Sequence, residues 1–136
     1  GLLAALYREY DQRQNQKMDD ALRTTKAELA PRATVIATAY IECVLLQGRE
    51  MPSVLAALAG TPELEKIRQE YAADFIEKCR ALFTPFCVKP LRDAALWAML
   101  GAAEGLSWAA VQGAITEAQA KEELKAVIMA MVQASV

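Results

Sequence analysis

Residues 90–112, PLRDAALWAMLGAAEGLSWAAVQ, decide the fold of this chain. After Arg92 and Asp93 their only formal charge is Glu104, and a helix drawn through them carries apolar or small side chains on every side. A helix that is apolar all round must be buried all round. A chain of 136 residues can cover only part of that surface. We therefore predict a helix that packs on its own domain along one side and on a second copy of the protein along the other.

The composition predicts one domain, residues 1–136, with a full hydrophobic core. Hydrophobic residues make up 54% of the chain, which is enough for a core without disulfide bonds. Cysteine occurs 3 times, an odd number that is typical of a reducing compartment, so we expect a cytoplasmic protein. The net charge of −2 argues against direct binding of nucleic acid, which requires a basic face.

Caps and helix breakers divide the chain into helices, and no segment shows the alternation of a strand. Pro31 is expected to open the second helix and Gly48 to end it. Thr61 and Pro62 predict the start of the fourth helix, and Thr116 predicts a capping box at the start of the last. The predicted helices cover residues 2–26, 31–48, 53–59, 62–83, 92–112 and 116–132. The predicted fold is an all-α, single-domain bundle of about six helices.

A catalytic or metal-binding role is not expected. The chain has no histidine, which is the commonest general base and metal ligand. Glu42 and Glu104 are the acids nearest to apolar residues, but neither has a partner at an informative spacing. Cys79 and Cys87 are explained more simply as small apolar residues than as a redox pair. We predict no enzyme activity, no cofactor and no metal.

Residues 94–115 come close to the length of a membrane span. Roughly 20 apolar residues are needed to cross a bilayer. This stretch is built on alanine and glycine, contains Glu104 and Gln112, and lacks flanking basic clusters. We therefore expect no membrane partner.

The order of helices resembles the regulatory domain of the tetracycline-repressor (TetR) family of bacterial transcription regulators, and the resemblance covers nearly all 136 residues. GLLAALYREYD at residues 1–11 looks like the long helix that follows the DNA-binding headpiece of that family. MPSVLAALAGTPELEKIRQEYAADFIEKCRALF at 51–83 looks like its short helix followed by a long one. RDAALWAMLGAAEGLSWAAVQ at 92–112 and TEAQAKEELKAVIMAMV at 116–132 look like its two final helices.

The resemblance implies an effector-binding and dimerisation domain of a transcriptional regulator, usually a repressor. In the family, the last two helices pack on those of a second copy to form a four-helix bundle. The headpiece has no counterpart in these 136 residues, so DNA binding is expected only through a segment outside them. The residues predicted at the dimer interface are Leu100, Glu104, Ser107, Val111, Leu124, Val127, Ile128 and Met131.

Aromatic residues accompanied by many small ones predict a pocket for a small, largely apolar effector. Large rings beside alanines leave room that close packing would otherwise fill. A filled core of rings against alanines is the other interpretation, and the family resemblance favours the pocket. The residues predicted to bind the effector, between the second, fourth and fifth helices, are Tyr40, Cys43, Tyr71, Phe75, Cys79, Phe86, Trp97 and Trp108. The alternative function is a helical homodimeric scaffold domain without a ligand pocket.

Overall fold

The computed structural model describes residues 1–135, which form a single all-α domain of six helices. Within this range there is no strand. The helices are α1 (Leu2–Thr24), α2 (Leu29–Glu50), α3 (Pro52–Leu58), α4 (Pro62–Phe83), α5 (Asp93–Val111) and α6 (Glu117–Gln133). A 3₁₀ turn, η1 (Thr84–Phe86), directly follows α4. The predicted all-α class and the predicted number of helices are confirmed.

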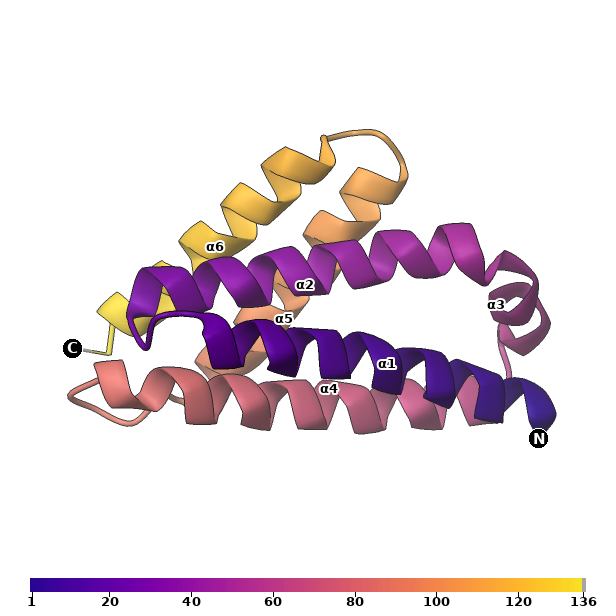
Figure 1. Ribbon diagram of the computed structural model, residues 1–136, viewed down its shortest axis with the longest axis horizontal. Coiled ribbons are helices and arrows are strands. Elements are labelled where there is room, and N and C mark those ends of the chain that lie inside the picture. Colours follow the sequence, from indigo (N-terminus) through magenta and orange to yellow (C-terminus); the bar gives the residue numbers. More distant parts are fainter. Residues whose placement is uncertain (136) are drawn as a thin grey trace.

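The long helices α1, α2 and α4 run lengthwise, and α5 and α6 cross them obliquely (Figure 1). α5 and α6 pack against each other as an antiparallel pair, and both pack on α2. α3 lies at the end of the molecule near the N-terminus, and the last turn of α6 lies at the opposite end. The arrangement gives two distinct regions, an interior between α1, α2 and α4 and the outer side of the α5–α6 pair.

The helix starts at α4 and α6 follow from side-chain caps that the sequence predicts. The Thr61 hydroxyl accepts a hydrogen bond from the backbone N–H of Leu64 at 3.2 Å. At α6, Thr116 and Gln119 form a reciprocal capping box, with bonds of 2.9 and 3.0 Å. These bonds satisfy N–H groups that have no partner inside the helix. Gly113, at φ +78°, supplies the left-handed backbone conformation between α5 and α6.

The boundaries of α2 differ from the prediction. α2 begins at Leu29, and Pro31 lies within its first turn, where a missing N–H costs no hydrogen bond. The helix also continues through Gly48 to Glu50, so Gly48 does not end it. Met51 leaves the helical conformation because it precedes Pro52, whose ring disfavours an α conformation in the preceding residue.

The main core lies where α5 and α6 pack on α2 and α4. Leu96 and Met99 of α5, with Leu124 and Ile128 of α6, are at most 1% exposed. Fully burying a side chain of this size contributes about 1.5–3 kcal/mol. A smaller cluster joins the beginning of α1 to α3 and the beginning of α4, and it consists of Ala4, Tyr7, Leu58, Leu64 and Ile67.

α2 and α5 are both long and apolar enough to cross a membrane, with mean hydropathies of 1.5 and 1.3 over their most apolar windows. The core helices of soluble proteins have the same property, so the match is weak evidence for a span. Both helices supply buried side chains to the main core, including Ile36, Ile41, Leu96 and Ala103.

Candidate functional site

The outward side of α5 is an uncovered apolar surface. Trp97, Trp108 and Val111 are 55%, 63% and 52% exposed. The residues between them on the same side are small, apart from Glu104. We call this surface the α5 outer face, and its exposed residues are Ala94, Trp97, Ala98, Gly101, Glu104, Gly105, Trp108 and Val111. Contiguous exposed apolar surface of this kind marks interaction sites on soluble proteins.

The glycines of the α5 outer face leave space above the helix. A Cβ added at Gly101 or at Gly105 would meet no atom within 4 Å. The chain itself therefore does not require glycine at either position. Small side chains allow a second helix to approach the backbone of α5 closely, so the face suits close packing of another helix.

The structure places most of the predicted dimer-interface residues in the core of a single chain. Glu104 and Val111 are exposed on α5, and Val127 is half-buried on α6. The others are at most 8% exposed and belong to the core of the chain, so they are not available to a second copy: Leu100, Ser107, Leu124, Ile128 and Met131. The Ser107 hydroxyl donates to the Ala103 carbonyl at 2.7 Å, inside its own helix. Both sides of α5 are apolar, and α2, α4 and α6 cover the side that carries Leu96 and Leu100.

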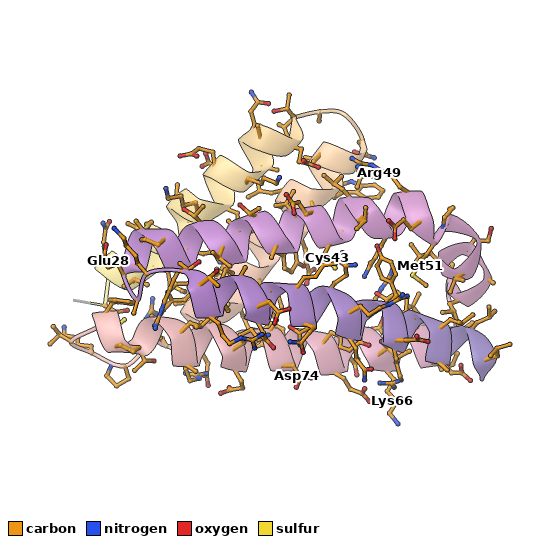
Figure 2. All side chains as sticks on the ribbon, in the orientation of Figure 1. Glu28, Cys43, Arg49, Met51, Lys66 and Asp74 are labelled. Atoms are coloured by element: carbon orange, nitrogen blue, oxygen red, sulfur yellow. The ribbon has the colours of Figure 1, made fainter. Side chains whose placement is uncertain are left out.

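A second candidate site is a polar cluster between α1 and α2. The Gln47 amide donates to the Asp11 carboxylate at 3.2 Å, and the Cys43 thiol lies 3.9 Å from the same oxygen. The Gln47 nitrogen is also 3.7 Å from the Cys43 sulfur. Figure 2 shows Cys43 at the edge of α2 that faces α1. We call Asp11, Cys43 and Gln47 the Asp11 cluster.

The Asp11 carboxylate is part-buried and has only neutral hydrogen-bond partners. Burial raises its pKa from 3.8 to about 6, and the bonds from Gln47 and Cys43 oppose this shift only in part. Among the described residues, no lysine or arginine forms an ion pair with Asp11. Taking a carboxylate out of water without a cationic partner is costly. Burial also raises the pKa of Cys43 to about 12, which keeps its thiol protonated and unreactive near neutral pH.

Tyrosine rings surround the Asp11 cluster. Tyr7 of α1 stacks on Tyr71 of α4 with ring centroids 6.1 Å apart, and Tyr40 of α2 meets Phe75 of α4 at 5.0 Å. The hydroxyls of Tyr10 and Tyr71 are buried and have no hydrogen-bond partner in the described part of the chain. Burial raises the pKa of each to about 12. The interior between α1, α2 and α4 thus combines aromatic surface with polar groups that are not fully satisfied.

The structure brings together four of the residues predicted to bind an effector, namely Tyr40, Cys43, Tyr71 and Phe75. Cys79 lies in the main core with no exposed surface.

The remaining predicted effector residues lie elsewhere. Phe86, on η1, lies under the Arg32 guanidinium, 5.5 Å from it. Trp97 and Trp108 are more than half exposed on the α5 outer face and do not point into this interior. Their rings face outward because the inward positions of α5 are taken by Leu96, Met99 and Leu100.

Asp11 and Gln47 are not among the residues predicted from the sequence to bind the effector. Nearly all of residues 10–17 are polar, a composition typical of a solvated helix surface. A signal was present, since Asp11 follows Tyr7 by four positions and therefore shares a helix face with it. Gln47 follows Cys43 by the same interval. Polar residues aligned with a buried aromatic or thiol are candidates for an interior site.

Two pockets among the described residues lie outside both the Asp11 cluster and the α5 outer face. One of about 280 Å³ opens between α1 and α2, with Met18, Thr38 and Glu42 among its lining residues. Another of about 290 Å³ lies beside the N-terminus and includes Arg8 and Ile67. Neither is lined by a residue predicted to bind the effector. The Tyr40–Phe75 contact shows that part of the predicted pocket is occupied by its own side chains.

Replacing Asp11 is expected to stabilise the protein in a pH-dependent way. The pKa of Asp11 is higher in the folded state than in the unfolded state. As the pH rises from about 4 to about 6, Asp11 therefore loses its proton in the unfolded state before it does so in the folded state. Above that range the buried charge lowers the free energy of unfolding. Asp11→Asn should raise the free energy of unfolding at pH 7.5 by about 1 kcal/mol, a value reduced for the partial exposure of the group. The gain should vanish near pH 3.5. Urea denaturation at the two pH values measures it.

The matched control for this experiment is Asp74→Asn, which makes the same charge change on an exposed side chain of α4 (Figure 2). It should alter stability by less than about 0.5 kcal/mol at either pH. Destabilisation by Asp11→Asn at pH 7.5 would contradict the assignment of Asp11 as an unfavourably buried charge.

Neither candidate site has the composition of a metal centre. Within residues 1–135, no group of three or more Cys, Asp or Glu side chains is placed to hold a metal ion. The sites offer instead an apolar docking face and an interior of aromatic and hydrogen-bonding groups. Comparison of the chain with protein-family models, with curated proteins and with solved structures found no match.

Proposed function

We propose that this chain is the effector-sensing and dimerisation domain of a TetR-like bacterial transcriptional regulator, acting as a homodimer in the cytoplasm and most simply as a repressor. The uncovered α5 outer face carries this proposal, because two tryptophans more than half exposed are costly to leave in water. A second copy is the occupant that fits best. In a two-fold dimer the α5 outer face of one copy packs on the same face of the other copy. Its apolar residues then contact apolar residues, and its glycines lie close to glycines.

The position of the Asp11 cluster supports the sensing role. α1 contributes Tyr7 and Asp11 to the interior and also begins at Leu2, where a preceding DNA-binding headpiece would connect. A ligand bound between α1, α2 and α4 would favour one position of α1 over another. A ligand shifts such an equilibrium only by its differential affinity for the two states, and a coupling of about 1–3 kcal/mol is sufficient for a switch. Two headpieces in a dimer would then change their spacing on DNA.

A scaffold without a ligand site is the second candidate. It is favoured by one observation, the contact between the Tyr40 and Phe75 rings inside the predicted pocket. This candidate shares the dimer and lacks the response to effector. Ligand-induced thermal stabilisation over a panel of small aromatic compounds separates the two, since a scaffold is stabilised by none of them.

The dimer is tested by Gly101→Ala. In an isolated chain the added methyl group meets nothing within 4 Å, so the variant should fold and gain about 0.8–1 kcal/mol of helix propensity. In a dimer whose α5 helices cross closely, the methyl group separates them and should raise the dissociation constant by about tenfold, a cost of about 1.4 kcal/mol. Sedimentation equilibrium over a range of concentrations measures the constant.

Gly48→Ala is the matched control. Gly48 lies in α2, is exposed and would also accept a Cβ with no atom within 4 Å. It should leave the dissociation constant unchanged. A wild-type protein that sediments as a monomer at micromolar concentration, or equal constants for the two variants, would contradict close packing of α5 in a dimer.

A further inference from the structure

The Asp11 cluster contains a charge that the described part of the chain leaves without a partner of opposite sign. Its contacts are a neutral amide and a neutral thiol, at 3.2 and 3.9 Å. Among the described residues, no neighbouring basic side chain forms an ion pair with Asp11: Arg8 pairs with Glu70 at 2.8 Å, Arg68 adjoins the Tyr7 hydroxyl, and Lys17 is exposed on the side of Cys43. A part-buried carboxylate in such surroundings is complementary to a positive charge brought by a ligand.

The buried hydroxyl of Tyr71 supports the same conclusion. Tyr10 is 4% exposed, and the hydroxyls of Tyr10 and Tyr71 both lack a hydrogen-bond partner among the described residues. The Asp11 charge, together with burial, raises the pKa of Tyr71, so the Tyr71 hydroxyl belongs with the cluster, whereas the Tyr10 hydroxyl adjoins the Glu50 carboxylate. Buried hydroxyls without partners are rare and call for a specific explanation. The Tyr71 hydroxyl can accept a hydrogen bond from a ligand N–H.

The rings beside the cluster define the rest of the ligand. Tyr7 and Tyr71 present stacked aromatic surface, and Tyr40 and Phe75 present a tilted pair. Aromatic faces attract organic cations and also bury apolar carbon. An inorganic cation is less suitable, because within residues 1–135 no third acidic or thiol ligand joins Asp11 and Cys43.

We propose that the interior between α1, α2 and α4 binds a small organic ammonium ion, with the charged nitrogen at the Asp11 carboxylate and the apolar part against the rings of Tyr40 and Tyr71. This inference rests on the effector-sensing part of the proposed function and specifies the chemical class of the effector. It also changes the effector expected from the sequence, which was largely apolar. Because Asp11 belongs to α1, the ammonium ion binds directly to the helix that would connect to a headpiece.

The test compares ligands of one shape and different charge on the full chain at pH 7.5. Benzylamine is protonated at this pH, ethylbenzene is its neutral isostere, and benzoate carries the opposite charge. A charge-assisted hydrogen bond at Asp11 should make the benzylammonium ion bind about tenfold or more tightly than ethylbenzene, by titration calorimetry. Benzoate should not bind. Equal affinities for benzylamine and ethylbenzene, or no binding of benzylamine, would overturn the proposal.

Variants show whether Asp11 itself provides the selectivity. Asp11→Asn should reduce benzylamine affinity about tenfold and leave ethylbenzene affinity unchanged, while Asp74→Asn should change neither. Tyr71→Phe removes only the unpartnered hydroxyl and should weaken benzylamine binding by a smaller factor. A structural role for Asp11 predicts a destabilised Asp11→Asn protein, whereas a ligand-binding role predicts a variant that is more stable and binds less.

The outcomes also separate this inference from the proposed function. Tight binding of ethylbenzene that Asp11→Asn does not affect would leave effector sensing in place and refute the ammonium ion. Absence of binding for all three ligands, with a dimer in sedimentation, would refute the inference and favour the scaffold candidate. A monomer that binds benzylamine through Asp11 would support the inference and contradict the dimeric regulator.

Discussion

Leu124→Ala is expected to lower the free energy of unfolding by about 2–5 kcal/mol, the range for removing a buried leucine side chain down to Cβ. Leu124 has no exposed surface and lies in the main core with Ile128, Leu96 and Phe83. The helices around it are held by many other contacts, so the gap will close only in part. Urea denaturation at one fixed protein concentration measures the loss, because dimerisation would make the apparent stability depend on concentration.

The control for Leu124→Ala is Leu2→Ala, at a leucine that is 77% exposed. This change should alter stability by less than about 0.5 kcal/mol. Leu124 was predicted from the sequence to lie at the dimer interface, and the experiment distinguishes the two locations. If Leu124→Ala weakened the dimer and left the free energy of unfolding unchanged, Leu124 would have to lie at the surface and the described core would be wrong.

Trp108→Asp is expected to dissociate the dimer. The ring is 63% exposed on the α5 outer face, and a two-fold interface would bring both copies of it toward the centre of the contact. Truncating a central aromatic anchor typically costs 2 kcal/mol or more, and the new carboxylate would be buried without a partner, so we expect a dissociation constant raised by about a hundredfold or more. Within one chain the side chain contributes little, so the monomer should remain folded.

Sedimentation equilibrium measures this change, and fluorescence provides a second readout. Both tryptophans of the chain, Trp97 and Trp108, lie on the α5 outer face, so dilution of the wild type should shift its emission to longer wavelength as the rings become hydrated. Val88→Asp is the matched control, since Val88 is 79% exposed between η1 and α5 and outside the face. An unchanged mass for Trp108→Asp would refute the proposed interface.

The helices of this protein could be predicted from local sequence signals. Thr61 and Thr116 cap their helices in the structure as the sequence predicts, because a cap depends on residues within one turn. The start and end of α2 were less accurate, since a proline in the first turn and a glycine in the last turn are both compatible with a continuing helix. Local chemistry therefore defines the elements and leaves their ends uncertain by a few residues.

The candidate site could be predicted only in part. Tyr40, Cys43, Tyr71 and Phe75 were identified as a group, because rings and small residues recur on faces that pattern analysis detects. Asp11 was not identified. Its one sequence signal is the four-residue spacing from Tyr7, and its altered pKa arises only when α2 and α4 pack beside α1.

The sequence by itself determined that this chain forms an all-α domain and that α5 carries more apolar surface than its neighbours bury. Only the tertiary structure decided which side of α5 faces outward, and therefore that Leu100 belongs to the core while Trp97 and Trp108 lie on the surface. Periodicity cannot distinguish two sides that are both apolar, because the hydrophobic effect is non-directional and rewards either orientation. The choice depends on which side fits the shapes of α2, α4 and α6, and shape complementarity exists only once those helices are packed together.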